Sequence, residues 1–476
     1  MRCLMKVFTR IPFHRYSGFA AAIAVFLVSS ASSVATAAYN HPVMWTDMSE
    51  FSVEAALTLP YSSPANLYNP SFSDSVLNEV ARDKENKINS KFKIPHEIRP
   101  AVTFWLKIYT RFTTQHIVLY DSRHPDVIYE ALDFRRTAET AKSRLVYEVI
   151  VKNKLKKTIA AYKTAFASLA RNSRPKNPSR EQKLILKATR NLPHKHDFAD
   201  LKKHMRSQTG QRDNIIKGLI AAETFFPKME LIFSKMNLPI ELTRLSLVES
   251  SFTYSAISRV GATGVWQFMP DSGREFLMID EDAKIDERLS PLKSTVAAGK
   301  LLKRNFRVLK NWALAITSYN HGTRSLRKIA ASEDFKTIAP YFSFCSKRKG
   351  TIGWASRNYY PEFLAVLYAE TYRDRLYGEV PKTLIRPIVY ESPGNYPNPL
   401  AFALHRGINL QEFKLLNPDI RDLSRRFPPD LLVAVPGERD NVSLLFVEAS
   451  RRRKAPSGKA RPLLASGPRI STDQRR

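Results

Sequence analysis

The sequence predicts a mainly α-helical protein, and three observations support this fold class. Between residues 212 and 376, apolar residues recur at helical spacing and strand-like runs are nearly absent. The section before it combines helical patterns with two short β-rich runs, and prolines become frequent beyond residue 376. We therefore expect a central helical domain, an α-rich N-terminal section carrying a small hairpin, and a small C-terminal α/β module.

Residues 1–37 have the layout of a secretory signal peptide. An apolar run over residues 19–28 follows a basic start, and small residues lead up to Ala37. This run is about half the roughly 20 residues that a membrane-spanning helix needs, which disfavours a transmembrane anchor. We expect cleavage after Ala37 and export to the periplasm or cell envelope. The mature chain would then keep only Cys345 and form no internal disulfide.

The chain is strongly basic, with a formal net charge of +31. A large positive excess remains when the signal segment and the basic C-terminal tail are left out. No zinc-finger spacing, RNP-like strand or phosphate-binding Gly-rich loop accompanies this charge. In an exported protein the available polyanions are membrane surfaces and cell-wall polymers. We therefore expect attraction to such a surface, no nucleic-acid partner, and a monomer.

The front of the mature chain divides into two parts. Residues 38–95 are rich in Ser, Pro and Asn with weak periodicity, which predicts a partly ordered lead-in. Residues 96–211 form the N-terminal helical section, where an apolar face beginning at Ile98 predicts a helix. The β-rich runs at 117–120 and 127–134 then predict the hairpin. A basic helical pattern over residues 138–172 completes this section.

The central section, residues 212–376, is of a size that one apolar core can serve. An amphipathic pattern predicts a first helix at 212–236. Pro239 then starts a second helix that ends near Glu249, because proline suits the first helical turn. Four more helical patterns follow, at residues 291–308, 312–319, 326–331 and 359–376.

The C-terminal part changes character twice. Residues 377–440 contain a helical stretch at 400–416 and an apolar run at 431–436, which predict a small α/β module. Residues 441–476 are basic and poor in apolar side chains, so we expect a disordered tail.

Glu249 is the candidate catalytic residue. It ends an apolar-patterned helix, and a carboxylic acid held neutral by apolar surroundings can protonate a leaving oxygen near neutral pH. Alone it would be an ordinary helix-end glutamate. The segments GATGVWQFMP at 261–270 and SYNHG at 318–322 add amide, phenol and aromatic groups of the kind that line sugar sites. Together they suggest a site that cleaves glycans.

A second catalytic carboxylate is harder to find. Glycosidases usually use two. The acidic residues downstream of Glu249 fall mostly in a run typical of a solvated loop: Asp271, Glu275, Asp280, Glu281, Asp282, Asp286 and Glu287. We favour a mechanism with one acid, and hydrolysis with a second carboxylate such as Asp286 is the alternative.

Six short motifs stand in a fixed order from Glu249 onward. They are Glu249-Ser250, GATGVWQFMP at 261–270, DER at 286–288, STVAA at 294–298, YNHG at 319–322 and ASRNYYP at 355–361. This order resembles the SLT domain of lytic murein transglycosylases, and the last motif is similar to that of their D-type branch, where a proline starts the following helix. The resemblance implies a lysozyme-like fold for residues 212–376, peptidoglycan strands as substrate, and no cofactor.

The resemblance also implies roles for single residues. Glu249 would protonate the oxygen between N-acetylmuramic acid and N-acetylglucosamine, and its carboxylate would then deprotonate the muramoyl O6, which closes a 1,6-anhydro ring. Ser250 would orient this acid. Four side chains would contact substrate: Gln267, Tyr319, Asn320 and Tyr359.

Two further features of the sequence allow more than one interpretation. His194, His196 and His204 lack accompanying thiol or acidic ligands, so we expect an exposed loop and no metal. Residues 377–440 resemble a degenerate LysM carbohydrate-binding repeat without its usual Gly-Asp-Thr turn. A non-catalytic wall-binding protein, held by this module and the basic tail, is therefore a further alternative.

Overall fold

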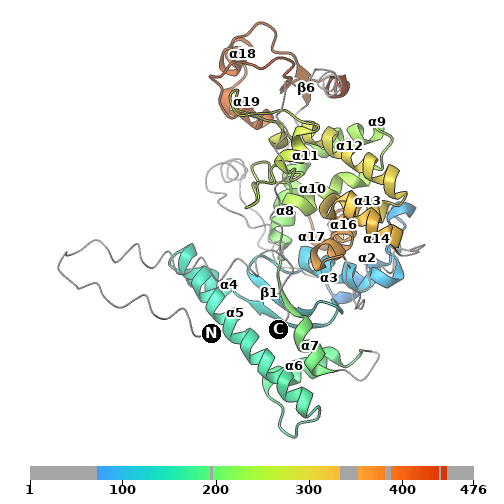
Figure 1. Cartoon of the computed structure of the whole chain (residues 1–476). Helices are drawn as coiled ribbons and strands as arrows, with labels where there is room; N and C mark the ends of the chain where they lie inside the picture. The colour runs from blue at the N-terminus through green and yellow to red at the C-terminus, as the bar shows by residue number, and fades with distance from the viewer. Residues whose placement is uncertain (1–71, 193–196, 333–351, 381–386, 439–440, 448–476) are drawn as a thin grey trace, which may run out of the picture. The chain divides into compact units, whose positions relative to one another are not determined.

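The computed structural model describes residues 72–192, 197–332, 352–380, 387–438 and 441–447. Within these ranges the chain is mostly helical with a few small sheets (Figure 1), which confirms the predicted fold class. The signal segment and the tail beyond residue 447 lie outside the described residues. No helix in the described ranges combines the length and apolar character needed to cross a membrane.

The front section contains a three-stranded antiparallel sheet. Strands β1 (His116–Asp121) and β2 (Ile128–Asp133) form the predicted hairpin, and β3 (Met205–Thr209) pairs with the other edge of β1. The third strand was not predicted, because its sequence lacks an apolar alternation. The helices and 3-10 turns of this section are α2 (Asp74–Ala81), η2 (Ser90–Phe92), η3 (His96–Ile98), α3 (Arg99–Thr110), α4 (Arg135–Thr140), α5 (Arg144–Arg171), α6 (Arg180–Thr189) and α7 (Phe198–His204).

The buried apolar side chains of the front section belong to several separate clusters. Helices α5, α6 and α7 bury one cluster around Tyr162 and Phe166. In contrast, α2 and α3 share the core of the central domain, where Leu77 and Trp105 are buried. Helix α2 lies inside the stretch expected to be a partly ordered lead-in. The hydrophobic face of α2 is short. Its burial depends on packing partners from helices that are distant in sequence.

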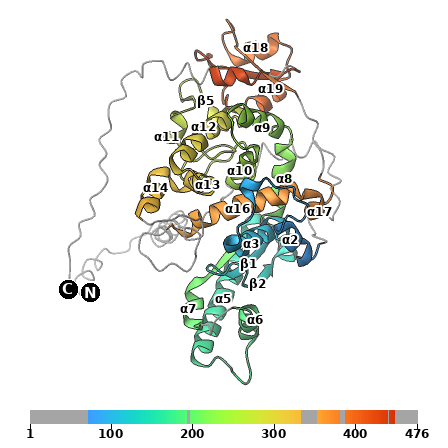
Figure 2. The same ribbon diagram turned by 90° about the vertical axis from the view of Figure 1, so that its right-hand side faces the viewer.

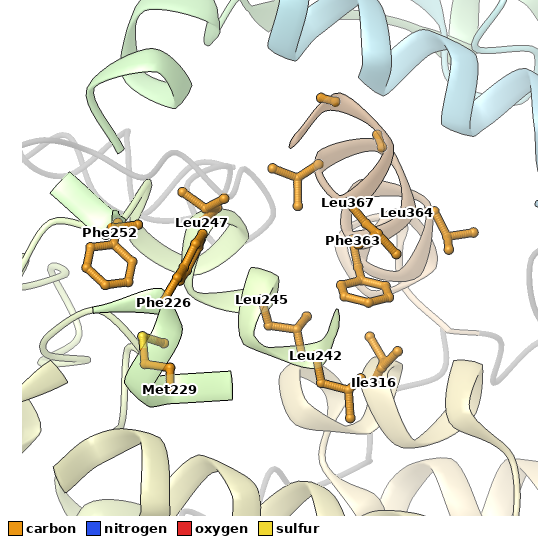
Figure 3. Packing of buried hydrophobic residues seen from close by; sticks show 14 of the residues in the cluster. Phe226, Met229, Leu242, Leu245, Leu247, Phe252, Ile316, Phe363, Leu364 and Leu367 are labelled. Atoms are coloured by element: carbon orange, nitrogen blue, oxygen red, sulfur yellow. The ribbon is translucent and has the colours of Figure 1, made fainter. Parts of the chain in front are cut away.

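The central domain is built from helices of very different length. They are α8 (Arg212–Ala222), α9 (Phe226–Lys235), η4 (Ile240–Arg244), α10 (Leu245–Ser250), α11 (Pro270–Arg274), η5 (Glu287–Leu289), α12 (Pro291–Leu309), α13 (Trp312–His321), α14 (Thr323–Ser332), α16 (Trp354–Thr371) and α17 (Arg373–Tyr377), with the two-residue strands β4 (Ile279–Asp280) and β5 (Ile285–Asp286). Side chains of η4 and α10 meet those of α16 in the core: Leu242, Leu245 and Leu247 lie in the same cluster as Phe363, Leu364 and Leu367 (Figure 3). This packing holds α10 in place.

Two helix predictions need correction at prolines. The single helix expected over 212–236 is two helices, and Pro227 lies in the first turn of α9, a position that suits proline. Conversely, Pro361 was expected to start a helix but lies inside α16, which begins at Trp354. Proline removes a backbone donor within a helix, so burial of the surrounding side chains must offset that loss.

Helix α3 of the front section lies along α16 of the central domain (Figure 2). The indole Nε1 of Trp105 donates a hydrogen bond to Asn358 Oδ1 at 2.8 Å. Arg212, which starts α8, is 1% exposed and donates to the carbonyls of Thr110 and Leu376. The front section thus packs directly against α16.

The C-terminal module has the order strand, two helices, strand. Strands β6 (Ile388–Glu391) and β7 (Val433–Pro436) pair antiparallel, and α18 (Pro399–His405) and α19 (Leu410–Leu416) lie between them in sequence. The single helix expected at 400–416 is interrupted by Gly407, which has a φ of 64°. Residues expected to begin the disordered tail are partly ordered, since Val442 and Leu445 are buried.

Candidate active site

Glu249 lies at the C-terminal end of α10, where the chain turns sharply. Ser251 and Phe252, which follow the helix, both adopt left-handed backbone conformations, with φ of 45° and 61°. Gly218 of α8 lies against this turn, and a Cβ there would be 2.3 Å from the Ser251 carbonyl oxygen. Close approach of two backbones therefore fixes the end of the helix that carries Glu249.

The carboxyl group of Glu249 is poised to hold a proton near neutral pH. The side chain is 8% exposed, and burial raises its pKa from the usual 4.5 to about 7. The Tyr359 hydroxyl of α16 donates a hydrogen bond to Glu249 Oε1, which opposes this rise. Tyr359 was expected to contact sugar, and the structure places its hydroxyl directly on the acid.

The segment 261–268 forms a tight loop beside α10. Thr263 and Phe268 exchange backbone hydrogen bonds of 3.0 and 3.1 Å, which close the turn between them. Gly264 within it has a φ of 78°, and a Cβ there would lie 1.9 Å from the Arg288 carbonyl oxygen. Arg288 also donates from its guanidinium to the carbonyls of Gly261 and Phe268. The loop conformation therefore depends on glycine and on this arginine.

Gln267 is turned into this loop. Its amide nitrogen donates to the carbonyls of Ala256 and Gly264, at 3.2 and 2.9 Å, and its φ is 46°. The structure gives its amide oxygen no hydrogen bond within the described part of the chain. The nitrogen therefore orients the side chain, and the oxygen stays available as an acceptor.

Ser250 connects the helix end to the loop. Its hydroxyl donates to the carbonyls of Ser246 and Val265, at 3.3 and 3.1 Å, and accepts from the Thr253 amide. All of these partners are backbone groups. The side chain is fully buried, so it contributes to the site by fixing backbone.

Tyr319 and Asn320 end α13 on the other side of the loop. Tyr319 donates to the Trp266 carbonyl at 2.9 Å, and the Glu249 charge adds to the burial that raises its pKa. Asn320 accepts from the Ser356 hydroxyl at 3.0 Å through its side-chain oxygen. Both side chains are half-buried. Tyr319 thus shares the electrostatic environment of Glu249, whereas the described contacts of Asn320 lead to α16.

Asp286, considered as a second catalytic carboxylate, is occupied elsewhere. Its two oxygens accept from Arg288 at 2.9 and 2.8 Å, in a buried bidentate pair. Trp266 is fully buried and donates to Thr295, so its role is packing. The pair and the tryptophan both support the loop that carries Gln267.

Two residues of the site were missed from the sequence. Glu362 lies three residues after Tyr359 on α16, and the Tyr109 hydroxyl of α3 donates to it at 3.5 Å. Burial raises the pKa of Glu362 to about 8, and the Glu249 charge adds to this rise. Residues three apart share a helix face, so the register of ASRNYYPEF could have indicated Glu362. Nothing in the sequence connects Tyr109 to this site.

No group of three or more metal-binding side chains is present among the described residues. His194 and His196 lie outside the described ranges. The arrangement around Glu249 therefore offers one buried carboxylic acid with a phenol donor on it, a tyrosine and an amide nearby. Such a group can give a proton to a leaving oxygen and take one back.

Comparison with known proteins identifies a family model that matches part of the central domain. The family model of the transglycosylase SLT domain matches residues 234–342. Two proteins called membrane-bound lytic murein transglycosylase D, from Escherichia coli strain K12 and E. coli O6:H1 (strain CFT073 / ATCC 700928 / UPEC), are each 34% identical over 95 residues. A protein of Alteromonas sp. (strain M-1), named for tributyltin chloride resistance, is 33% identical over 142 residues.

The extent of these matches differs. The aligned segment covers 20% of this chain and 21% of the E. coli proteins, so the similarity spans about a fifth of their length. It covers 27% of this chain and 68% of the Alteromonas protein.

Proposed function

Because the chain belongs to the transglycosylase SLT-domain family, we propose that it is an exported lytic transglycosylase that cleaves peptidoglycan. The bond is the β-1,4 link between N-acetylmuramic acid and N-acetylglucosamine, and the product carries a 1,6-anhydromuramoyl end. The observation that supports this most strongly is the buried Glu249 with a pKa of about 7. A carboxyl group with such a pKa can serve as acid and as base at neutral pH.

The reaction needs two proton transfers, and Glu249 makes both. In the first, neutral Glu249 protonates the glycosidic oxygen while the bond to the anomeric carbon breaks, which leaves a carboxylate. In the second, this carboxylate takes the proton of the muramoyl O6 hydroxyl as O6 bonds to the anomeric carbon. Glu249 ends protonated, and no water is consumed. Tyr359 supports the intermediate state, because its hydrogen bond stabilises the carboxylate form.

The remaining predicted residues bind or position substrate. The free amide oxygen of Gln267 accepts from a sugar hydroxyl or acetamido N–H. Tyr319 and Asn320, at the end of α13, contact the sugar beside the cleaved bond. Ser250 keeps the loop against α10 through its backbone hydrogen bonds.

We propose that the C-terminal module binds the cell wall. The connection from β6 to α18 and the connection from α19 to β7 border a cavity of about 390 Å³, lined by polar and aromatic side chains that include Asn395, Tyr396, Arg426 and Phe427. Aromatic faces with amide and guanidinium donors suit carbohydrate. The domain boundaries at residues 37, 95, 211, 376 and 440, and the LysM likeness of the module, belong to the same proposal.

Product analysis tests the proposal. Purified protein is incubated with peptidoglycan sacculi, and the released muropeptides are identified by mass spectrometry. Wild type should release anhydro ends, whereas Glu249→Gln should release none and remain folded by circular dichroism. Glu241→Gln, the same change eight residues earlier and away from the site, is the matched control. Products heavier by one water would indicate a hydrolytic muramidase, in which Glu362 becomes the second carboxylate to examine.

A further inference from the structure

Helix α5 of the front section exposes apolar side chains that its packing does not use. Four large apolar side chains in its first two turns are between 41% and 70% exposed: Leu145, Val146, Val149 and Ile150. They form two pairs spaced four residues apart, so they make one continuous stripe along the helix, here called the outer stripe. A contiguous exposed apolar patch with a polar border is typical of an interaction site.

The opposite side of α5 is packed against the rest of the front section. Tyr147 and Val151 pack against a cluster that includes Phe134. Helices α6 and α7 lie beside the C-terminal half of α5 (Figure 1). Leu145 and Val149 each lie two residues from Tyr147, which is about 200° around a helix of 3.6 residues per turn. The outer stripe therefore points away from the packed side.

Lysines continue the outer stripe along α5. Lys152, Lys156 and Lys157 each follow a member of the outer stripe by seven residues, about two helical turns, so they lie on the same side of the helix. All three are exposed. Lys154, in contrast, lies 5.7 Å from the centre of the Phe134 ring and so belongs to the packed side. The outer side of α5 is thus apolar at its start and basic beyond.

The positive charge of this surface is not neutralised by the helix itself. Glu148 is the only acidic residue of α5, and Arg144 donates to it at 3.0 Å. Among the described residues, no salt bridge joins Lys152, Lys156 or Lys157 to an acid. The three lysines therefore remain available to an anionic partner.

The combination of apolar and basic side chains selects the chemistry of that partner. A glycan polymer can offer anionic groups to the lysines, but it offers no apolar phase to Leu145 and Val149. A second copy of this chain would bring the same lysines together across a symmetric contact, which like charges oppose. An anionic lipid bilayer meets both requirements, because its headgroups attract lysines and its acyl chains accept apolar side chains.

We propose that the outer side of α5 docks the protein on the surface of an anionic lipid bilayer. The helix lies parallel to the bilayer plane, with the outer stripe at the boundary between headgroups and acyl chains. Lys152, Lys156 and Lys157 contact the headgroups, and their apolar stems extend the buried surface. This role goes beyond the cleavage of peptidoglycan, since it keeps the enzyme at the membrane while the site around Glu249 acts on the wall.

Co-sedimentation with lipid vesicles tests the proposal. Residues 38–476 are used, because the apolar run of the expected signal peptide could itself enter a bilayer. Vesicles contain either phosphatidylcholine alone or equal parts of phosphatidylcholine and phosphatidylglycerol. Wild type should sediment with the mixed vesicles and stay in solution with phosphatidylcholine alone. Added salt should weaken the binding, because it screens the charges.

Two double variants separate the apolar contribution from the basic one. Leu145→Ser with Val149→Ser should weaken binding to mixed vesicles at least about tenfold, since it removes side chains that enter the boundary region. Lys156→Gln with Lys157→Gln should weaken it about 25-fold, at about fivefold for each lysine. The replaced side chains are exposed, so both variants should stay folded by circular dichroism.

Matched controls carry the same changes elsewhere. Leu404→Ser with Leu415→Ser removes two exposed apolar side chains from the C-terminal module. Lys183→Gln with Lys187→Gln removes two exposed lysines from α6. These lysines each lie two residues from Ile185, which is buried in the core shared with α5, so they point away from that helix. Both controls should bind the vesicles as wild type does.

Three outcomes would overturn the proposal. The first is equal vesicle binding by wild type and by Leu145→Ser with Val149→Ser. The second is an equal loss in the two double lysine variants, which would attribute binding to overall charge. The third is a dimer in sedimentation velocity, dissociated by the change at Leu145 and Val149, without vesicle binding. All variants should release muropeptides from sacculi, which contain no bilayer, at the wild-type rate, so failure of the proposed function would be seen separately.

Discussion

The molecule buries carboxyl groups in two places, and the two differ in whether a cation accompanies them. In the site, the buried Glu249 and the half-buried Glu362 have phenol partners, and their pKa values rise to about 7 and about 8. Where the C-terminal module meets the central domain, Glu287 and Asp419 flank Lys293, at 3.2 and 2.7 Å, and all three are nearly fully buried. There burial raises the pKa of Asp419, and the charge of Lys293 opposes the rise.

The difference separates a structural cluster, formed by Lys293, Glu287 and Asp419, from a reactive cluster, formed by Glu249 and Glu362. Lys293 bonds to Asp419, which is 126 positions away in sequence, beside the backbone hydrogen bond from Asp286 to the Asp419 carbonyl. A buried charge without a partner destabilises the fold, so carboxyl groups left without a cation indicate a chemical use. The following changes test this distinction.

The largest expected effect is on activity. Glu249→Gln should lower the rate of muropeptide release at least about 10²–10⁴-fold, because it removes the group that transfers the proton. The rate is measured at pH 6, with Glu241→Gln as the control that keeps wild-type activity. If Glu249→Gln retained a tenth of the wild-type rate, the acid would have to be sought elsewhere.

Removing the cation should make the structural cluster resemble the reactive one. Lys293→Met leaves Glu287 and Asp419 buried without a positive charge, and the free energy of unfolding at pH 7 should fall by about 3–5 kcal/mol. Urea titration measures this, and part of the loss should be recovered at pH 5, where the carboxyl groups can take up protons. Lys303→Met, on the same helix α12, removes a donor to the Met236 carbonyl and should change stability little. Equal losses in both variants would contradict the comparison.

The reactive cluster should destabilise the fold as pH rises. Folded Glu249 has a pKa of about 7, above the usual 4.5, so the folded state binds this proton more tightly than the unfolded state. The resulting stability is present below pH 4.5 and is lost between pH 4.5 and 7. Compared with wild type, Glu249→Gln should therefore gain up to about 3 kcal/mol in free energy of unfolding between those limits. Parallel stability curves for the two proteins across this range would refute it.

The smallest effect concerns the phenol on the acid. The hydrogen bond from Tyr359 lowers the pKa of Glu249, so Tyr359→Phe should move the alkaline limb of activity to higher pH. Loss of a hydrogen bond to a charged group should also reduce the plateau rate about tenfold. Tyr368→Phe, on the same helix but bonded to the Ile94 amide, is the control and should leave the limb in place. A limb that shifts downward in Tyr359→Phe would show that the hydroxyl does not stabilise the carboxylate.

Much of the fold could be predicted because it depends on local pattern. The hairpin of β1 and β2 and the helices α12 and α13 lie where apolar spacing places them. The break between α8 and α9 was missed although Pro227 marks it, since continuous apolar spacing outweighed one residue. The likeness of 377–440 to a carbohydrate-binding repeat stays a prediction.

The candidate site could be predicted only in part, because some contacts join distant segments. Glu249, Gln267 and Tyr319 occur in short motifs, so the sequence indicated them. Tyr359 was named, but its bond to Glu249 spans 110 positions and depends on how α16 packs against α10. The contact of Tyr109 with Glu362 spans 253 positions and leaves no local pattern.

The distinction between the two clusters can be measured directly by carbon-13 NMR of protein labelled in its glutamate carboxyl groups. Glu249→Gln and Glu362→Gln assign the two site resonances, and a titration from pH 4 to 9 follows them. We predict that both acids ionise near or above pH 7. When one acid is replaced, the resonance of the other should titrate in a single step. A Glu249 resonance that titrates near its usual 4.5 would contradict the assignment of this residue as the general acid.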